Sequence, residues 1–190
     1  MKVLFLGGTR FVGKALLSRL LSNGNELFVF TRGNLPVPIN VNHIQGDRSK
    51  DEDLKKLSDH SFDLIVDSSG RKLEDTKRLL DFSGIPNFRF IYISSAGVYD
   101  NTQLFPVDED CPIDTESRHI GKANTESWLK AEGIPFTSFR PTYIYGPGNY
   151  NRIEKWFFDR IINGRSIPVP FDGQAITQLG HVSDLDEAIS

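Results

Sequence analysis

Cysteine is nearly absent from this sequence of 190 residues, which contains Cys111 alone. A single cysteine excludes an internal disulfide and a zinc site built from cysteines. No apolar run approaches the roughly 20 residues needed to cross a bilayer. No basic and apolar leader precedes the strand expected from residue 2. We therefore expect a cytoplasmic protein without membrane association.

An excess of positive charge is also missing. The formal net charge is −3 and the isoelectric point is about 5.8, so the chain as a whole does not attract nucleic acid. Any binding of RNA must use a local basic patch. The rest of the composition, with 38% hydrophobic and 25% charged residues, is ordinary for a globular protein with a full core.

Strand and helix patterns alternate along the chain, which predicts a parallel sheet covered by helices on both faces. Apolar strands are expected at 2–6, 26–31, 41–45, 62–67, 88–94 and 135–140. Helices are expected between the first two strands and at 51–58, 71–82, 116–131 and 151–163. The predicted fold class is therefore α/β, with a Rossmann-type doubly wound parallel sheet.

The pattern indicates two unequal parts. We expect residues 1–150 to form a Rossmann-type nucleotide-binding domain and residues 151–190 to begin a smaller C-terminal substrate or partner region. The second part includes a segment that returns to the nucleotide-binding core. A helix that starts near His181 is cut off at Ser190, so we expect the C-terminal region to be truncated.

The first strand runs straight into a glycine-rich turn that opens a helix. Such a turn aims backbone N–H groups and a helix N-terminus at an anion, so it predicts a nucleotide-phosphate site. The residues expected to bind the cofactor here are Gly7, Gly8, Thr9, Arg10, Phe11, Val12 and Gly13. The middle glycine of the usual spacing is missing, because Arg10 occupies its place and brings bulk and a permanent positive charge.

The acidic residue that holds a ribose 2′-hydroxyl is missing as well. It is expected about 20 residues after the glycine turn, at the end of the second strand, where the chain has Thr31-Arg32-Gly33. Arg32 is compatible with a 2′-phosphate, so NADP is preferred over NAD if a dinucleotide binds. The alternative is that Arg32 is an exposed turn residue.

Five sequence landmarks follow one another in a recognisable order. They are the turn at 7–13, Gly46-Asp47-Arg48, Ser94-Ser95-Ala96-Gly97-Val98-Tyr99, RPTYIYGP at 140–147 and HVSDL at 181–185. Together they resemble the extended short-chain dehydrogenase/reductase superfamily of nucleotide-sugar epimerases and dehydratases, over essentially the whole chain. The resemblance implies an NAD or NADP site in which Asp47 contacts the adenine amino group. Alternatively, Asp47 caps the turn after Gly46.

A catalytic tyrosine is the most consequential absence. Members of this superfamily use a Ser or Thr, a Tyr, and a Lys four residues after the Tyr, a spacing that places Tyr and Lys on one helix face. The resemblance assigns the serine to Ser95 and the lysine to Lys122, but Arg118 stands where the tyrosine belongs. A guanidinium cannot relay a proton near neutral pH. His119 either substitutes as the acid/base or is a polar surface residue.

The second half of the chain carries a closer resemblance. The segments SRHIGKANTES, RPTYIYGPGNYNRIEKWFFDRI, SIPVP and QLGHVSDL are similar to the chloroplast stem-loop-binding proteins and their cyanobacterial mRNA-binding relatives. Those proteins share GGTR in the glycine turn and lack the tyrosine. The resemblance implies binding of structured RNA, endoribonuclease activity assisted by a divalent metal, and association with ribosomes or transcription complexes.

Basic residues gather beyond the expected strand ends, which predicts a phosphate-binding cleft in an otherwise acidic chain. They are Arg10, Arg32, Arg48, Arg71, Arg118, His119, Lys122 and Arg140. The carboxylates Asp47, Asp67 and Asp184 are isolated in the sequence, and no metal site can be assembled from them.

Three functions remain open at this point. The favoured one is an RNA-binding protein on a catalytically altered dehydrogenase fold, with weak endoribonuclease activity implied by the resemblance. The second is an NADP- or NAD-dependent epimerase, dehydratase or reductase with rearranged acid/base residues. The third is a regulatory subunit that senses a dinucleotide without chemistry. The superfamily also implies a homo-oligomer, formed through a helix pair that includes residues 116–131.

Overall fold

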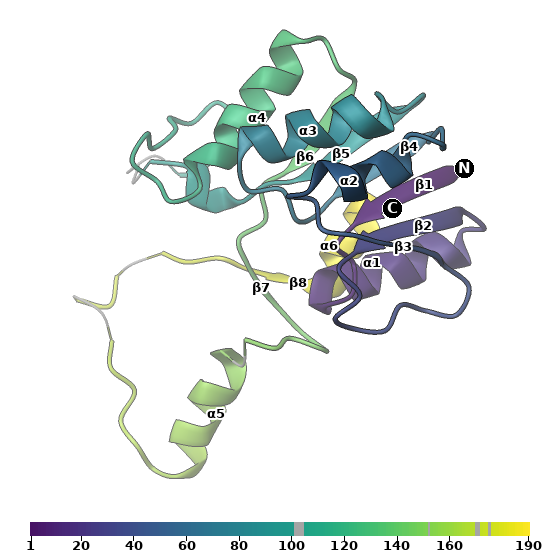
Figure 1. Cartoon of the computed structure of the whole chain (residues 1–190). Coiled ribbons are helices and arrows are strands. Elements are labelled where there is room, and N and C mark those ends of the chain that lie inside the picture. Colours follow the sequence, from purple (N-terminus) through teal and green to yellow (C-terminus); the bar gives the residue numbers. More distant parts are fainter. Residues whose placement is uncertain (101–104, 152, 170–171, 175) are drawn as a thin grey trace.

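The computed structural model describes residues 1–190 except 101–104, 152, 170, 171 and 175. The strands of its main sheet are β1 (Lys2–Leu6), β2 (Glu26–Thr31), β3 (Asn42–Gln45), β4 (Leu64–Asp67), β5 (Arg89–Ile93) and β6 (Phe136–Phe139). All six are parallel and lie in the order β3-β2-β1-β4-β5-β6 (Figure 1). The strand order reverses between β1 and β4, which places a crevice at the carboxyl ends of these strands.

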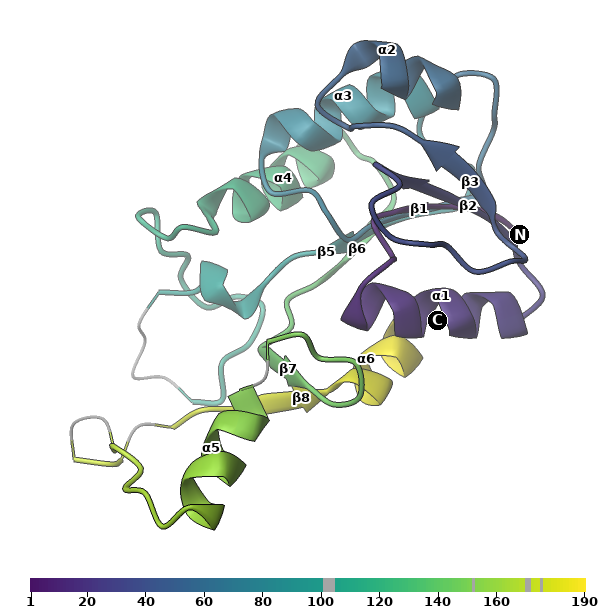
Figure 2. The same cartoon turned by 60° about the horizontal axis from the view of Figure 1, so that its bottom comes forward.

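Helices cover both faces of this sheet. On one face lie α1 (Phe11–Ser22) and α6 (Val182–Ile189), and on the other lie α2 (Asp51–Leu54), the 3-10 helix η1 (Lys55–Leu57), α3 (Leu73–Ser83) and α4 (Ile120–Ala131) (Figures 1 and 2). A second short 3-10 helix, η2 (Ala96–Val98), follows β5. None of the described helices is both long enough and apolar enough to cross a membrane.

The alternation of side chains along the buried strands divides the core into two layers. Leu4 and Leu6 of β1 pack in the layer that includes Leu79 of α3 and Leu129 of α4. Val3 and Phe5, whose side chains point the other way, pack in the layer that includes Leu16, Leu17 and Leu20 of α1 and Ile189 of α6. Both faces of β1 are therefore apolar, as a central parallel strand requires.

The predicted α/β class and doubly wound sheet are confirmed, but one helix start is wrong. Helix α4 begins at Ile120 and not at residue 116. Asp114 accepts a hydrogen bond from the N–H of Glu116 (2.8 Å), and Ser117 Oγ accepts one from the N–H of His119 (3.0 Å). These side chains satisfy backbone donors outside a helix. Residues 118 and 119 therefore lie in the turn before α4, and only Lys122 is helical.

The chain leaves the main sheet after β6. β7 (Tyr143–Tyr145) pairs in parallel with β8 (Leu179–His181) in a second, two-stranded sheet. Between them, α5 (Ile153–Ile162) projects away from the rest of the chain, and none of its residues is buried (Figure 2). Helix α6 then packs beside α1, where Arg19 Nε donates to Asp186 Oδ1 at 2.8 Å.

Candidate functional site: a cationic cleft at the strand ends

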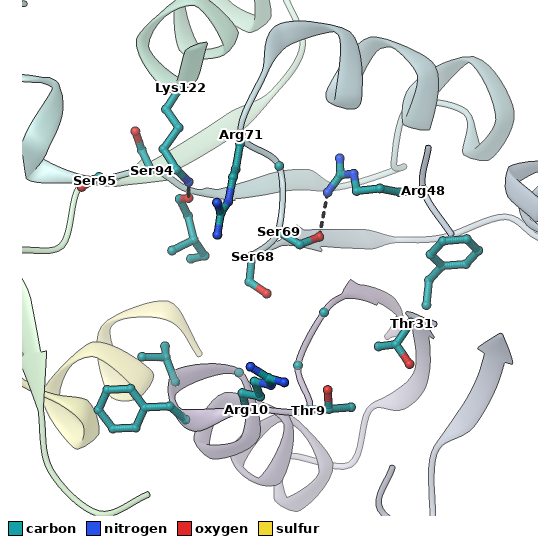
Figure 3. A pocket seen from close by; sticks show the side chains of 18 of the residues that line it. Thr9, Arg10, Thr31, Arg48, Ser68, Ser69, Arg71, Ser94, Ser95 and Lys122 are labelled. Atoms are coloured by element: carbon teal, nitrogen blue, oxygen red, sulfur yellow. Dashed lines mark hydrogen bonds between the residues drawn. The ribbon is translucent and has the colours of Figure 1, made fainter. Parts of the chain in front are cut away.

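A cleft of about 1170 Å³ opens at the carboxyl ends of β1, β2, β4 and β5 (Figure 3). All thirteen residues predicted to bind a cofactor or to act in catalysis line this one cleft. They are Gly7, Gly8, Thr9, Arg10, Phe11, Val12, Gly13, Arg32, Asp47, Ser95, Arg118, His119 and Lys122. In Figure 3 the glycine turn with Thr9 and Arg10 lies on one side, and Lys122, Ser95 and Arg71 lie across from it.

The glycine turn brings α1 very close to β1. Gly7 and Gly8 have positive φ angles of 93° and 86°, which side chains disfavour. A Cβ atom built on Gly13 would lie 2.5 Å from the Cα of Gly8, so only glycine allows this approach. No acidic residue occupies the first turn of α1, and the N–H groups of that turn have no partner within the helix. The turn therefore fits the phosphates of a dinucleotide.

Arg10 fits the turn in which glycine is usual. It is the N-cap residue of α1 with φ −133° and ψ 149°, an extended conformation that any residue adopts, and its side chain makes no capping hydrogen bond. Its guanidinium lies 5.7 Å from the ring centroid of Tyr150, within the range of a cation–π contact. Phe11, the next residue, has a positive φ of 33°, a strained conformation of the kind found at binding sites.

Arg32 and Asp47 lie together at the β2 end of the cleft. Asp47 accepts hydrogen bonds from the N–H and the hydroxyl of Ser49, at 2.9 and 2.8 Å. These bonds, with a smaller contribution from Arg32, hold the pKa of Asp47 below its ordinary value. Asp47 thus caps a turn and also lines the cleft. The side chain of Arg32 is exposed and makes no ion pair among the described residues.

The wall of the cleft near β4 rests on a buried ion pair that sequence reasoning missed. Arg48 Nη1 and Nη2 donate to the two carboxylate oxygens of Asp67 at 2.7 and 2.9 Å. The Asp67 side chain is 0% exposed. Burial opposes its ionisation, but Arg48 together with the N–H groups of Ser69 and Gly70 outweighs burial, and the pKa of Asp67 lies below its ordinary value. Arg48 lines the cleft as predicted, but Asp67 neutralises its charge there, so it adds no unpaired cation to the cleft.

Lys122 reaches the cleft from the first turn of α4. Its Nζ donates to the carbonyl oxygen of Ile93, the last residue of β5, at 2.5 Å and lies 5.2 Å from the ring centroid of Tyr92. Burial, together with the positive charge of Arg71, lowers the pKa of Lys122 although Asp67 acts in the opposite direction. Four residues before Lys122 the sequence has Arg118.

Arg118 and His119 are joined by a hydrogen bond in the turn before α4. Arg118 Nε donates to His119 Nε2 at 3.0 Å, which requires an unprotonated nitrogen on the imidazole. Burial and the charges of Arg118, Lys122 and Arg71 lower the pKa of His119, in agreement with a neutral ring. The lone pair that a general base needs is therefore engaged by Arg118. The hydroxyl of Ser95 also makes a local hydrogen bond, since its Oγ accepts from the N–H of Gly97 at 3.1 Å.

Most cations of the cleft have no carboxylate partner. Within the described part of the chain, Arg10, Arg71, Arg118 and Lys122 form no ion pair. Arg140, also predicted at the cleft, does not line it. Its Nε donates to Glu126 Oε2 at 3.0 Å, and its Nη1 donates to the hydroxyl of Tyr99 at 2.8 Å. That prediction is wrong because a buried carboxylate on α4 captures the guanidinium.

The described residues contain no group of three or more His, Cys, Asp or Glu side chains placed to hold a metal ion.

Tyr150 is a cleft residue that sequence reasoning missed. The one signal for it was the glycine-rich run Gly146-Pro147-Gly148-Asn149 just before it, which marks a loop but not its destination.

Comparison with known proteins identifies the architecture. The sequence model of the NAD dependent epimerase/dehydratase family matches residues 3–190. The chain is 43% identical over 205 residues to the chloroplast stem-loop binding protein of 41 kDa b from Arabidopsis thaliana, covering 98% of this chain and 53% of that protein. It thus spans about half the length of this relative. It is 26% identical over 233 residues to a UDP-glucose 4-epimerase from Corynebacterium glutamicum, covering 99% and 69% of the two chains.

Among solved structures, the Thermus thermophilus UDP-glucose 4-epimerase in complex with NAD superposes with a TM-score of 0.79 at 20% identity. The match covers 100% of this chain and 73% of that one. At this level of identity the likeness concerns the fold alone.

Proposed function

The chain belongs to the NAD dependent epimerase/dehydratase family, and from this premise we propose that it binds RNA in the family's phosphate-binding cleft. The observation that carries the proposal is a set of five cleft cations that have no carboxylate partner among the described residues: Arg10, Arg32, Arg71, Arg118 and Lys122. One of them, Arg118, replaces the tyrosine that proton transfer requires. The relative named as a stem-loop binding protein supports RNA as the ligand.

The charges explain why an acidic chain can bind a polyanion. Among the described residues, five of the six ion pairs lie away from the cleft, for example Arg78 with Asp51 and Lys155 with Asp159. The sixth, Arg48 with Asp67, lies in the wall of the cleft, and the other cleft cations have no carboxylate partner in the described part of the chain. A concave wall of low dielectric concentrates their field. Each RNA phosphate that contacts one of them releases condensed counterions, so affinity falls as salt concentration rises.

We expect Arg118→Ala and Lys122→Met each to weaken RNA binding roughly tenfold, because each removes a charge-assisted hydrogen bond to phosphate. The slope of log affinity against log salt concentration should fall by about 0.7 per variant, the value for one contact to a single strand. Methionine retains most of the packing volume of Lys122 against Tyr92. Fluorescence anisotropy of a labelled hairpin RNA over a salt series measures both quantities.

Lys130→Ala is the matched control, since Lys130 is an exposed cation at the other end of α4, outside the cleft. It should change the RNA affinity less than twofold. If the unmodified protein fails to bind the hairpin at low salt, the proposal of RNA binding is wrong.

A second candidate function is binding of a dinucleotide, as the glycine turn and the retained Lys122 favour. The turn would hold the pyrophosphate, Lys122 would contact the ribose next to the nicotinamide, and Arg32 would contact the 2′-phosphate of NADP. A bound dinucleotide supplies hydride transfer. Proton transfer then has no tyrosine, and His119 has its lone pair engaged by Arg118. We therefore propose that the cleft binds a dinucleotide, and we do not include catalytic turnover in this second function.

Melting-temperature shifts test this second function. We expect NADPH and NADH to stabilise the protein more than NADP⁺ and NAD⁺, because the oxidised nicotinamide ring is positively charged and would lie near Arg71, Arg118 and Lys122. For a chain of this size, 1 kcal/mol of binding free energy raises the melting temperature by about 2–4 °C. Arg32→Ala should remove any advantage of NADPH over NADH. Equal shifts for all four dinucleotides contradict this charge argument.

We propose that residues 151–190 begin a C-terminal substrate or partner region, since α5 and β8, which both belong to it, lie outside the main sheet. The described residues contain no cluster of side chains that could hold the metal for an endoribonuclease activity. We therefore leave this activity out of the proposed function.

A further inference from the structure

Three cations converge at the α4 end of the cleft. Arg71 approaches from the loop between β4 and α3, Arg118 from the turn before α4, and Lys122 from the first turn of α4. Figure 3 shows the guanidinium of Arg71 directed into the cleft beside the ammonium of Lys122. This end lies across the cleft from the glycine turn and Arg10, so it is separate from the expected pyrophosphate position.

The loop that carries Arg71 is held in place by hydrogen bonds on both sides of it. Asp67 Oδ1 accepts from the N–H groups of Ser69 and Gly70 at 3.0 and 2.8 Å. Asp75 Oδ2 accepts from the N–H groups of Arg71 and Lys72, both at 3.2 Å. These bonds fix the backbone of Arg71 before any ligand arrives, which lowers the entropy cost of binding.

The same loop packs against α4 with no room for a side chain between them. A Cβ atom built on Gly121 would lie 2.4 Å from the carbonyl oxygen of Arg71. Glycine at this position lets the Arg71 backbone touch the first turn of α4, one residue before Lys122. The proximity of the two cations is therefore a consequence of backbone packing and not of a chance side-chain rotamer.

The three charges repel one another and no free carboxylate lies among them. Asp67 and Glu126 are the acidic groups close enough to influence Lys122, but Asp67 pairs with Arg48 and Glu126 pairs with Arg140. Arg118 uses only its Nε on His119, and within the described residues its terminal nitrogens and the Arg71 guanidinium have no hydrogen-bond partner. Like charges held together without a counterion favour the binding of an anion.

We propose that Arg71, Arg118 and Lys122 form a second phosphate subsite, so that the ligand carries anionic groups at both ends of the cleft. The inference rests on the proposed function and identifies the part of RNA that enters. A cavity of about 1170 Å³ is on the scale of a pocket for a small ligand, so an unpaired stretch of RNA enters and a base-paired stem stays outside. A dinucleotide has no phosphate to place at this end.

Arg71→Ala tests the subsite, with Lys72→Ala as the matched control. Lys72 is the neighbouring cation, is exposed and does not line the cleft, and both variants keep the backbone bonds to Asp75. We expect Arg71→Ala to weaken binding of a labelled single-stranded oligonucleotide about tenfold and to lower the salt slope by about 0.7. Lys72→Ala should change affinity less than twofold, and a blunt duplex without a loop should bind weakly to all three proteins.

Inorganic phosphate probes the subsite without RNA. At constant ionic strength, phosphate should raise the melting temperature of the unmodified protein, and Arg71→Ala should lose at least half of this shift while Lys72→Ala retains it. If the unmodified protein binds no RNA but its melting-temperature shift with phosphate depends on Arg71, the subsite is supported and the proposed function is wrong. If Arg71→Ala and Lys72→Ala behave alike toward both probes, the subsite is wrong. Arg118→Gln, in a different segment, repeats the test should Arg71→Ala fail to fold.

Discussion

Replacing Arg48 by alanine should destabilise the protein by about 3–5 kcal/mol, the cost of leaving one partner of a buried ion pair alone. Arg48 is 15% exposed and Asp67 is 0% exposed, so water cannot solvate the carboxylate that remains. Arg48 also donates to Ser69 Oγ at 2.7 Å and to the carbonyl oxygen of Asp75 at 3.1 Å. The loss of these contacts loosens the loop that carries Arg71. Urea unfolding measures the free energy.

The pH dependence gives this prediction a second readout. In the unmodified protein the pKa of Asp67 is lowered, because Arg48 and the N–H groups of Ser69 and Gly70 together outweigh burial. This carboxyl therefore stabilises the fold above its unfolded pKa of about 3.9 and loses that effect as the pH falls. Without Arg48, burial raises its pKa, and the variant loses stability as the pH rises above about 4. The difference between the two proteins should therefore be largest near pH 7 and should shrink toward pH 3.

Two further variants separate burial from charge. Arg78→Ala removes a half-exposed arginine that pairs with the exposed carboxylate of Asp51 and should cost only about 0–1 kcal/mol. Arg48→Met combined with Asp67→Asn removes both charges but keeps an oxygen for the N–H groups of Ser69 and Gly70. This double variant should recover a large part of the loss. A cost for Arg48→Ala as small as that for Arg78→Ala contradicts the argument.

Gly13→Val should abolish binding of phosphate ligands and destabilise the fold by about 1–3 kcal/mol. Valine adds a Cβ that would meet Gly8 Cα at 2.5 Å, and overpacking of this kind costs about that much. The higher helix propensity of valine would by itself stabilise the protein by a few tenths to 1 kcal/mol. The net change in the free energy of unfolding is destabilising only because of the clash. Because backbone atoms cannot move aside cheaply, α1 must shift from β1, and the turn loses its anion-binding geometry. We expect at least a hundredfold loss in RNA or dinucleotide affinity.

The control for this prediction is Gly24→Ala, in the turn after α1. Gly24 has a φ of 76° and no atom within 4 Å of a Cβ built on it, so alanine introduces backbone strain of about 1 kcal/mol without a clash. Its effect should be confined to stability, measured by urea unfolding, with ligand affinity unchanged. If Gly13→Val binds phosphate ligands as well as Gly24→Ala does, the close approach of α1 to β1 is not what makes the site.

The strands and the glycine turn were predictable because their signals are local. An apolar run such as Val3–Leu6, followed at once by Gly7 and Gly8, specifies a buried strand and a turn with positive φ from neighbouring residues alone. The start of α4 was not predictable in this way. The decision between helix and turn at residues 116–119 depends on Asp114 and on Ser117, whose Oγ donates to the carbonyl oxygen of Gly97 at 2.6 Å, a partner twenty residues away.

The cleft shows the same division. Its membership followed from the rule that sites form at the carboxyl ends of parallel strands, and all thirteen predicted residues line it. The sequence did not show which arginines have no carboxylate partner and can therefore attract an anionic ligand. Arg48 and Arg140 look like Arg71 and Arg118 in the sequence, yet Asp67 and Glu126 neutralise the first two inside the protein.

The sequence by itself determined the doubly wound fold and the glycine turn that opens α1, since strand periodicity and glycine at fixed positions are written in the order of residues. Only the tertiary structure decided the electrostatics of the cleft. A charge is neutralised by a partner close in space, and Asp67 lies 19 residues from Arg48 while Glu126 lies 14 from Arg140. Coulomb attraction depends on distance and dielectric, and both are properties of the folded chain.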